Sequence, residues 1–275
     1  MQISTRLKIL VIVFFILIGL KPVQAQWSLA AGLGATSYSG DVADPLPRDS
    51  RPAFNMEAWY RVSRGFYLKG GFSVFQLYAR DIYDSRNRTF KSELYDVYAG
   101  FMTGYPGRKL MPYLSAGIGL ARVEPANKVW KAGNQSWWFN TAKWQPDGEA
   151  IPMHTLIIPL SIGIRYRMSP RWGLVFDAGV RLTDTDMLDG VSKEFIIVDE
   201  LSEEGKAYYR AINPKGLENG TIVNGNPEKK DIYGMFTIKL QYIFGAKQKN
   251  HLNEYHEYIF SDKRNGFSIP MYCPY

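Results

Sequence analysis

A two-residue alternation of apolar and polar or small side chains recurs in eight segments of this sequence, and it constrains the fold more than any other feature. The first example runs from Trp27 to Thr36, where the odd positions are apolar and the even positions are small or polar. This period is typical of a β-strand whose two faces meet different surroundings. The eight segments span 27–36, 54–61, 66–74, 95–101, 113–120, 155–165, 172–181 and 236–244. Because a closed up-and-down barrel needs an even number of strands, the sequence predicts an all-β, eight-stranded antiparallel barrel.

The connections between these segments alternate between short and long. Three are tight turns, at 63–65, 106–110 and 168–171. The other links are long and span 38–52, 81–88, 124–153 and 185–231. Short turns at one end and long loops at the other describe a transmembrane barrel of the outer membrane, with its turns in the periplasm and its loops extracellular.

The polarity of the two strand faces separates this prediction from its alternative, a soluble eight-stranded barrel with an apolar interior. One face of the segments is almost wholly apolar, while the other carries glycines, serines and eight charged residues: Glu57, Arg61, Lys69, Asp96, Arg165, Asp177, Arg181 and Lys239. Since a lone buried charge is costly, we expect the acids Glu57, Asp96 and Asp177 to be paired inside the lumen. The expected partners are Arg165, Arg181 and Lys239. Such a lumen is filled by side chains and leaves no wide pore.

Aromatic residues on the apolar face gather next to the short turns. They are Trp27, Tyr60, Phe66, Tyr166, Trp172, Tyr242 and Phe244. A ring of aromatic side chains is expected where a barrel crosses the membrane interface. Pro159 is the exception to the strand pattern, because it cannot donate a ladder hydrogen bond, and we expect a bulge or an irregular pair there.

The N-terminal residues predict export. Arg6 and Lys8 precede an apolar run over 9–20, and small residues follow up to Ala25, so residues 1–25 are expected to form a cleaved signal peptide. An uncleaved anchor is the alternative, although a run of 12 residues is short for a membrane-spanning helix. The barrel would then occupy 26–245, and residues 246–275 would form a periplasmic C-terminal tail. The single Cys273 excludes an internal disulfide framework, and a formal charge of +7 without basic clusters gives no indication of nucleic-acid binding.

Evidence for catalysis is sparse. The histidines are His154, His251 and His256, and no serine or cysteine lies in a nucleophile motif such as G-x-S-x-G. One arrangement resembles a hydrolase site at a barrel rim, with His154 near Asp184 and Asp186, but a polar rim facing water is the expected interpretation. A calcium site over 184–189 is another alternative, because short acidic loops supply oxygen ligands, yet the EF-hand spacing is missing. We therefore expect no enzyme activity, no metal, no cofactor and no small-molecule substrate.

Several short motifs occur in an order known from one family. The run from Thr183 to Ser192 resembles the pattern T-x-T-D-Y-L-D-D-V-S, with Met187 and Gly190 as departures. Other landmarks are a Y-x-G-D motif after the first segment, a P-Y-x-x-x-G-x-G strand from Pro112 and an I-P pair at Pro159. The motif residues are Tyr38, Gly40, Asp41, Thr185, Asp186, Leu188, Asp189, Val191 and Ser192. In this order and spacing they resemble the Bacteroidota outer-membrane barrels that include PorG of the type IX secretion system.

The resemblance implies a non-enzymatic role. Barrels of that family are thought to tether periplasmic components of the secretion machine, so it implies an anchor in outer-membrane lipid with periplasmic secretion proteins as partners. An orphan barrel with no part in secretion is the alternative. In this framework the acidic run orders a loop: 183–186 end the strand, and Asp189 and Gly190 turn the chain into the last loop.

Two segments are candidates for partner contacts. The long loop over 124–153 holds four tryptophans, Trp130, Trp137, Trp138 and Trp144, and exposed aromatic clusters mark contact surfaces. These tryptophans could instead fold back as a lid over the barrel mouth. The tail carries further aromatic residues, among them Tyr255, Tyr258 and Phe260; it is either a docking segment or disordered.

Overall fold

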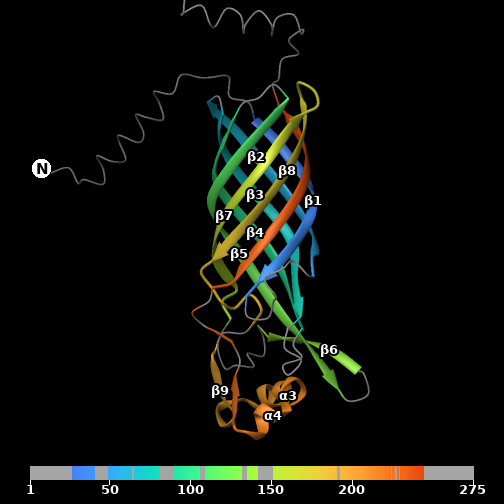
Figure 1. The fold of residues 1–275 in the computed structure, drawn as a ribbon, viewed down its shortest axis with the longest axis vertical. Helices are drawn as coiled ribbons and strands as arrows, with labels where there is room; N and C mark the ends of the chain where they lie inside the picture. Colours follow the sequence, from blue (N-terminus) through green and yellow to red (C-terminus); the bar gives the residue numbers. More distant parts are fainter. Residues whose placement is uncertain are drawn as a thin grey trace, which may run out of the picture.

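The computed structural model forms a closed cylinder of eight long antiparallel strands (Figure 1). It describes residues 27–40, 49–63, 65–80, 89–105, 109–131, 135–141, 151–190, 193–223, 225–226, 228 and 230–244. The barrel strands are β1 (Trp27–Ser39), β2 (Arg51–Ser63), β3 (Phe66–Arg80), β4 (Thr89–Gly104), β5 (Leu110–Lys131), β7 (His154–Arg167), β8 (Trp172–Thr183) and β11 (Ile232–Ile243).

Each barrel strand pairs with two other barrel strands, which closes the sheet. The order β4-β3-β2-β1-β11-β8-β7-β5 is completed by the pairing of β4 with β5. First and last strands meet along their whole length, from Ser28 opposite Ile243 to Ser39 opposite Ile232. The predicted fold, an eight-stranded antiparallel barrel, is therefore confirmed.

The outer surface of the barrel is apolar over its middle and aromatic toward the short turns. Leu33, Val97 and Ile118 are among its most exposed side chains. At the short-turn end, ring centroids lie 4.8 Å apart for Trp27 and Tyr60 and 4.9 Å apart for Trp172 and Tyr242. A girdle of aromatic rings at the rim is typical of a barrel at a lipid interface.

Beyond this apolar belt the polarity of the strands inverts. On β3 the inward residues Phe75 and Leu77 are apolar and buried, whereas Gln76 and Tyr78 point outward. The same change on β5 buries Val123 and exposes Glu124. The long-loop half of the barrel thus has an apolar interior and a polar exterior, as a soluble barrel has. The strands are longer than the predicted segments because they continue past the expected membrane boundary.

Pro159 interrupts the pairing of β5 with β7 without a bulge. The pairs run from Leu110 opposite Tyr166 to Ala116 opposite Leu160, and resume at Gly119 opposite Ile157. The register is the same on both sides of the gap, so the irregularity consists of two missing pairs. On the other edge of β7, pairing with β8 continues through Pro159.

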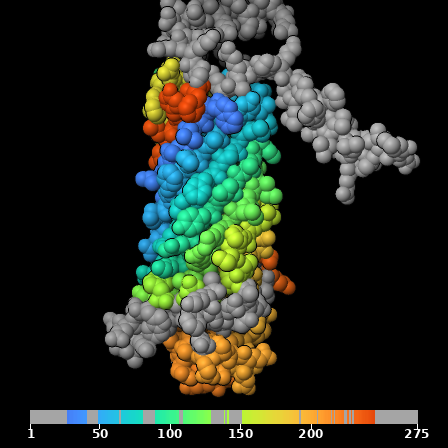
Figure 2. Space-filling model, turned by 180° about the vertical axis from the view of Figure 1, so that it is seen from behind, coloured from blue at the N-terminus to red at the C-terminus, as the bar shows by residue number. Residues whose placement is uncertain are grey.

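The long-loop end carries further structure. Strand β6 (Gln135–Asn140) pairs with the end of β5 as a protruding hairpin. Residues 193–223 form a separate unit, here called the cap, with β9 (Phe195–Ile197), η1 (Val198–Glu200), α3 (Glu203–Ile212), α4 (Pro214–Glu218) and β10 (Thr221–Val223). The cap is the orange cluster at the lower end of the molecule in Figure 2. Within the described part of the chain, no helix is both long and apolar enough to cross a membrane.

Candidate functional site

Ion pairs fill the middle of the barrel. The amino groups of Lys69 and Lys239 each lie 2.9 Å from Oε1 of Glu57. Both amino groups also face Asp177, at 3.7 and 3.9 Å. All four side chains are buried, and the buried tyrosines of the same layer add hydrogen bonds: Tyr98 donates to Glu57 and Tyr113 to Asp177, at 2.6 and 2.5 Å.

A second pair extends this layer toward the long-loop end. Nε of Arg181 lies 3.7 Å from Oδ2 of Asp96, and the hydroxyl of Tyr233 donates to the same oxygen at 3.1 Å. Both charged side chains are buried. The charged layer, defined by Glu57, Lys69, Asp96, Asp177, Arg181 and Lys239, therefore contains three acids and three bases, each of which contacts an opposite charge.

Arg165 lies outside the charged layer, although it was expected to pair with one of the three acids. Its guanidinium lies 6.0 Å from the ring of Tyr67, in the layer next to the short turns, and Lys69 provides the third cation of the charged layer instead. The reason is height along the barrel: Arg165 pairs with Val175 on β8, two residues nearer the short turns than Asp177.

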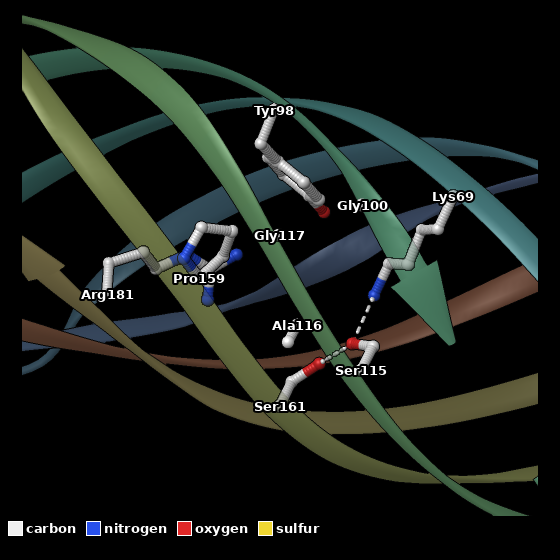
Figure 3. Close-up of a pocket in the computed structure, with 9 residues that line it drawn as sticks. All are labelled: Lys69, Tyr98, Gly100, Ser115, Ala116, Gly117, Pro159, Ser161 and Arg181. Carbon is white, nitrogen blue, oxygen red and sulfur yellow. Dashed lines mark hydrogen bonds between the residues drawn. The ribbon is translucent and has the colours of Figure 1, made fainter. Parts of the chain in front are cut away.

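Apolar layers close the lumen on both sides of the charged layer. Toward the short turns lie Trp59, Tyr67, Met102, Met111, Tyr113 and Val175. Toward the long loops lies a larger buried cluster that includes Phe75, Phe90, Tyr233 and Leu188. Figure 3 shows the small gap between Lys69, Ser115, Ser161 and Arg181, in which Ser115 contacts both Lys69 and Ser161. Its volume of about 10 Å³ is near the minimum for one water molecule.

The acidic run after β8 crosses the mouth of the barrel. Leu188 is fully buried in the apolar cluster of the long-loop end. Its backbone N–H donates to Oδ2 of Asp231 at 2.8 Å, and the hydroxyl of Thr183 donates to the carbonyl of Asp231 at 2.7 Å. We call residues 183–190 the latch, because this segment joins the end of β8 to the start of β11 across the opening.

Residues of two separate sequence motifs meet at the latch. The hydroxyl of Tyr38, at the end of β1, lies 2.5 Å from Oδ1 of Asp231 and 3.0 Å from Oδ2 of Asp189. A side chain at Gly40 would collide with the Tyr38 hydroxyl, at 1.9 Å. Gly190 has a φ of +79° and lies against Thr141, so it provides the turn that leads into the last loop. Asp231 is the member of this cluster that sequence reasoning missed; its position just before the last strand was the available signal.

The expected water-facing rim is only partly present. His154 and Asp184 are exposed, but Thr185, Asp186 and Asp189 are buried. Asp184 accepts hydrogen bonds from the hydroxyl of Thr155 and from the backbone N–H of Leu156, which fixes it to the start of β7. Among the described residues, no group of three or more His, Cys, Asp or Glu side chains could hold a metal.

The cap has a hydrophobic core of its own. Ile196, Leu201, Tyr208, Tyr209, Ile212 and Ile222 are buried in it. The side chain of Ser202 accepts a hydrogen bond from the N–H of Gly205 and begins α3. Nδ2 of Asn127 on β5 donates to the hydroxyl of Tyr208 at 2.9 Å, which joins the cap to the barrel wall. The cap was not predicted, although Ser202 followed by two acids is a helix-start signal.

Three of the four candidate contact tryptophans belong to the strands of the protruding hairpin. Trp130 is in β5, and Trp137 and Trp138 are in β6. Trp138 is exposed, and the amino group of Lys91 lies 4.7 Å from its ring. Several predictions fall outside the described residues: the signal peptide over 1–25, the tail over 246–275 with Tyr255, Tyr258 and Phe260, and also Asp41, Trp144, Val191, Ser192, His251 and His256.

Comparisons with known proteins return similar barrels among solved structures. Neisserial surface protein A shares 13% identity, with 79% of this chain and 97% of that chain covered and a TM-score of 0.42. The attachment invasion locus protein Ail of Yersinia pestis shares 14% (80% and 99% covered, TM-score 0.39). OprG of Pseudomonas aeruginosa shares 8% (80% and 96% covered, TM-score 0.40). No protein-family model and no curated protein matches the sequence. At these identities and TM-scores, the barrel assignment rests on the strand pairing of this chain.

Proposed function

We propose that this chain is a non-conducting outer-membrane barrel that serves as an anchor or assembly component of a secretion machine of the type IX kind. The closed lumen is the observation that carries the proposal. The three acids of the charged layer contact its three bases, apolar layers lie on both sides of it, and Leu188 is buried at the mouth. A barrel without a path for solutes acts through its surfaces.

The location in an outer membrane is supported by the outer surface. The exposed apolar belt is suited to contact the hydrocarbon of a membrane, and the paired rings of Trp27 with Tyr60 and of Trp172 with Tyr242 are suited to one membrane interface. The contacts of Tyr38 with Asp189 support the resemblance to PorG-containing barrels, because they bring two of its motifs together. An absence of enzyme activity is consistent with the exposed His154 and with the structural hydrogen bonds of Asp184.

Co-purification from cells tests the anchoring role. An anchor presents its contacts on the periplasmic side, where the short turns offer few residues and the tail expected over 246–275 would be the sizeable element. The full chain should therefore recover periplasmic proteins, and a chain that ends at Gly245 should lose them while still folding in the outer membrane. Equal recovery by both chains would argue against the tail as the tether.

A cap deletion provides the matched control. The N–H of Gly225 donates to the carbonyl of Lys193 at 2.8 Å, so a short glycine-serine linker can replace residues 194–224 without strain on the barrel. The anchor proposal predicts that this variant keeps its periplasmic partners.

Surface binding is the second candidate function. The cap exposes Phe195 and Ile197, and the hairpin exposes Trp138. Exposed apolar side chains that gather in a patch mark interaction surfaces. If the cap deletion abolishes partner recovery and the tail deletion does not, surface binding becomes the better account.

A further inference from the structure

Basic and aromatic side chains form a patch on the outer face of β3 and β4, just beyond the apolar belt. The guanidinium carbon of Arg51 lies 4.1 Å from the centroid of the Tyr78 ring. Nε of Arg80 donates to the hydroxyl of the same tyrosine at 3.0 Å. Lys91 is directly opposite Tyr78 in the β3–β4 ladder and contacts Trp138. We call these five residues the Tyr78 patch.

The register places Tyr78, Arg80 and Lys91 on the outside of the barrel at the membrane boundary. Arg51 begins β2 opposite the buried Thr36, and its guanidinium reaches the Tyr78 ring from the end of that strand. Phe72 and Val74 are the last apolar outward residues of β3, and Gln76, Tyr78 and Arg80 follow on the same face. Tyr78 therefore lies about 13 Å along the strand from Val74, which becomes about 10 Å above the apolar belt at the usual strand tilt. This is headgroup height, and long basic side chains extend along a barrel surface to meet headgroups.

Several described cations outside the patch are held by a carboxylate. Lys69 and Lys239 contact Glu57, and Arg122 lies 2.5 Å from Glu124. Within the described residues, the contacts of Arg51 and Lys91 are instead with aromatic rings. Nε of Arg51 is buried and has no hydrogen-bond partner there. A cation that stacks on a ring is held in place while its remaining donors stay available.

The local charge favours an anion. The patch itself carries three cations, Arg51, Arg80 and Lys91. Asp49, which acts electrostatically on Arg80, and the outward Glu93 offset part of this charge. The three cations of the patch exceed these two acids. Phosphate is the anion that matches an arginine fork and a lysine at this height, because phospholipid headgroups occupy the same level.

We propose that the Tyr78 patch binds the phosphate of an anionic lipid in the leaflet at the long-loop end of the barrel. Arg51 and Arg80 would donate to the phosphate oxygens, Lys91 would add charge, and the rings of Tyr78 and Trp138 would pack against the lipid at the interface. The barrel would then carry one ordered lipid at a fixed position beside its protruding hairpin.

Lipid retention measured by native mass spectrometry tests this site. Purified full-length protein is exchanged into detergent with either phosphatidylglycerol or phosphatidylcholine, and the lipid-bound fraction is measured for each. We expect retention of phosphatidylglycerol by the wild type and a loss of roughly thirtyfold in apparent affinity for the double variant Arg80→Gln, Lys91→Gln, since two cations near an anionic headgroup are removed. Arg122→Gln is the matched control, because Arg122 is already paired, and it should retain the lipid.

Three other results of this experiment also test the lipid site. If the double variant does not give the compact, heat-modifiable band of a folded barrel, Lys91→Gln alone carries the test, with a loss of roughly fivefold. Equal retention by wild type and variants, or no preference for phosphatidylglycerol, would overturn the proposal. Displacement of the lipid by inorganic phosphate would show that the site takes a free anion and not a lipid headgroup.

Discussion

At the scale of single residues, the chain depends on a few buried polar groups at the barrel mouth. Tyr38 contacts two carboxylates from distant parts of the sequence, and both carboxylates are buried. A phenol hydroxyl carries one proton, so this hydroxyl can donate to one of the two oxygens at a time. Tyr38 thereby couples the end of β1 to the latch and to the start of β11.

Removing this hydroxyl should loosen the latch. We expect Tyr38→Phe to lower the free energy of unfolding by about 1–3 kcal/mol, because two buried carboxylates lose a donor, and to make residues 183–231 more sensitive to protease. Urea unfolding in detergent and mapping of the cleavage sites measure the two effects. Tyr95→Phe, at an exposed position on the outer face, is the matched control and should change neither. Identical behaviour of both variants would contradict the role given to Tyr38.

Leu188 gives a second prediction at the same scale. Its side chain is fully buried among the apolar residues of the mouth, so Leu188→Ala should cost about 2–5 kcal/mol through lost burial and the cavity left behind. Leu120→Ala removes the same atoms from the exposed outer face and should cost much less in a detergent micelle. A loss below that of Leu120→Ala would mean that the latch does not pack into the lumen.

At the scale of elements, the sequence predicted the middle of each barrel strand and missed the ends. The segment expected over 113–120 is the strand Leu110–Lys131. The prediction depended on an apolar outer face. That face becomes polar at Arg122 and Glu124, where the inner residues Ala121 and Val123 are apolar instead. A strand that leaves the membrane keeps its two-residue alternation, but its apolar side chains now point into the barrel. The pattern expected for a membrane-spanning strand, with apolar residues outside, therefore stops at the membrane boundary.

The sequence predicted a layer of charged residues inside the barrel, but it did not predict which acid pairs with which base. The alternation placed Glu57 and Lys239 on the inner face, yet which acid meets which base depends on strand register. Glu57 is held by two lysines from different strands, β3 and β11. The mouth was harder to predict, because contacts such as Tyr38 with Asp231, 193 residues apart, carry no local pattern.

The charged layer should respond strongly to loss of one partner. Glu57→Gln would leave the amino groups of Lys69 and Lys239 with one fewer buried counter-charge, and we expect a loss of about 3–5 kcal/mol in the free energy of unfolding. The outward Glu93→Gln is the control and should change stability little. Folding yield and urea midpoints of the two variants in the same detergent measure the difference. Equal midpoints would show that the ion pairs are not structurally important.

At the scale of the whole molecule, the barrel consists of a membrane-facing half and a half that extends beyond the apolar belt. The second half carries the latch, the protruding hairpin and the cap (Figure 1). The hairpin and the cap therefore present their surfaces outside the lumen. Whatever the chain binds, the structure favours contacts with its outside or its ends over passage through its interior.

Conductance across a planar lipid bilayer tests the central claim, that the barrel is closed. Purified full-length protein, shown to be folded by its heat-modifiable band, is inserted beside an open porin as a positive control. The ion-paired layer, the apolar layers and Leu188 predict that insertion of this protein produces no stable current steps, while the porin conducts. Reproducible ohmic steps from the folded protein would contradict the closed lumen and with it the proposed role as a non-conducting anchor.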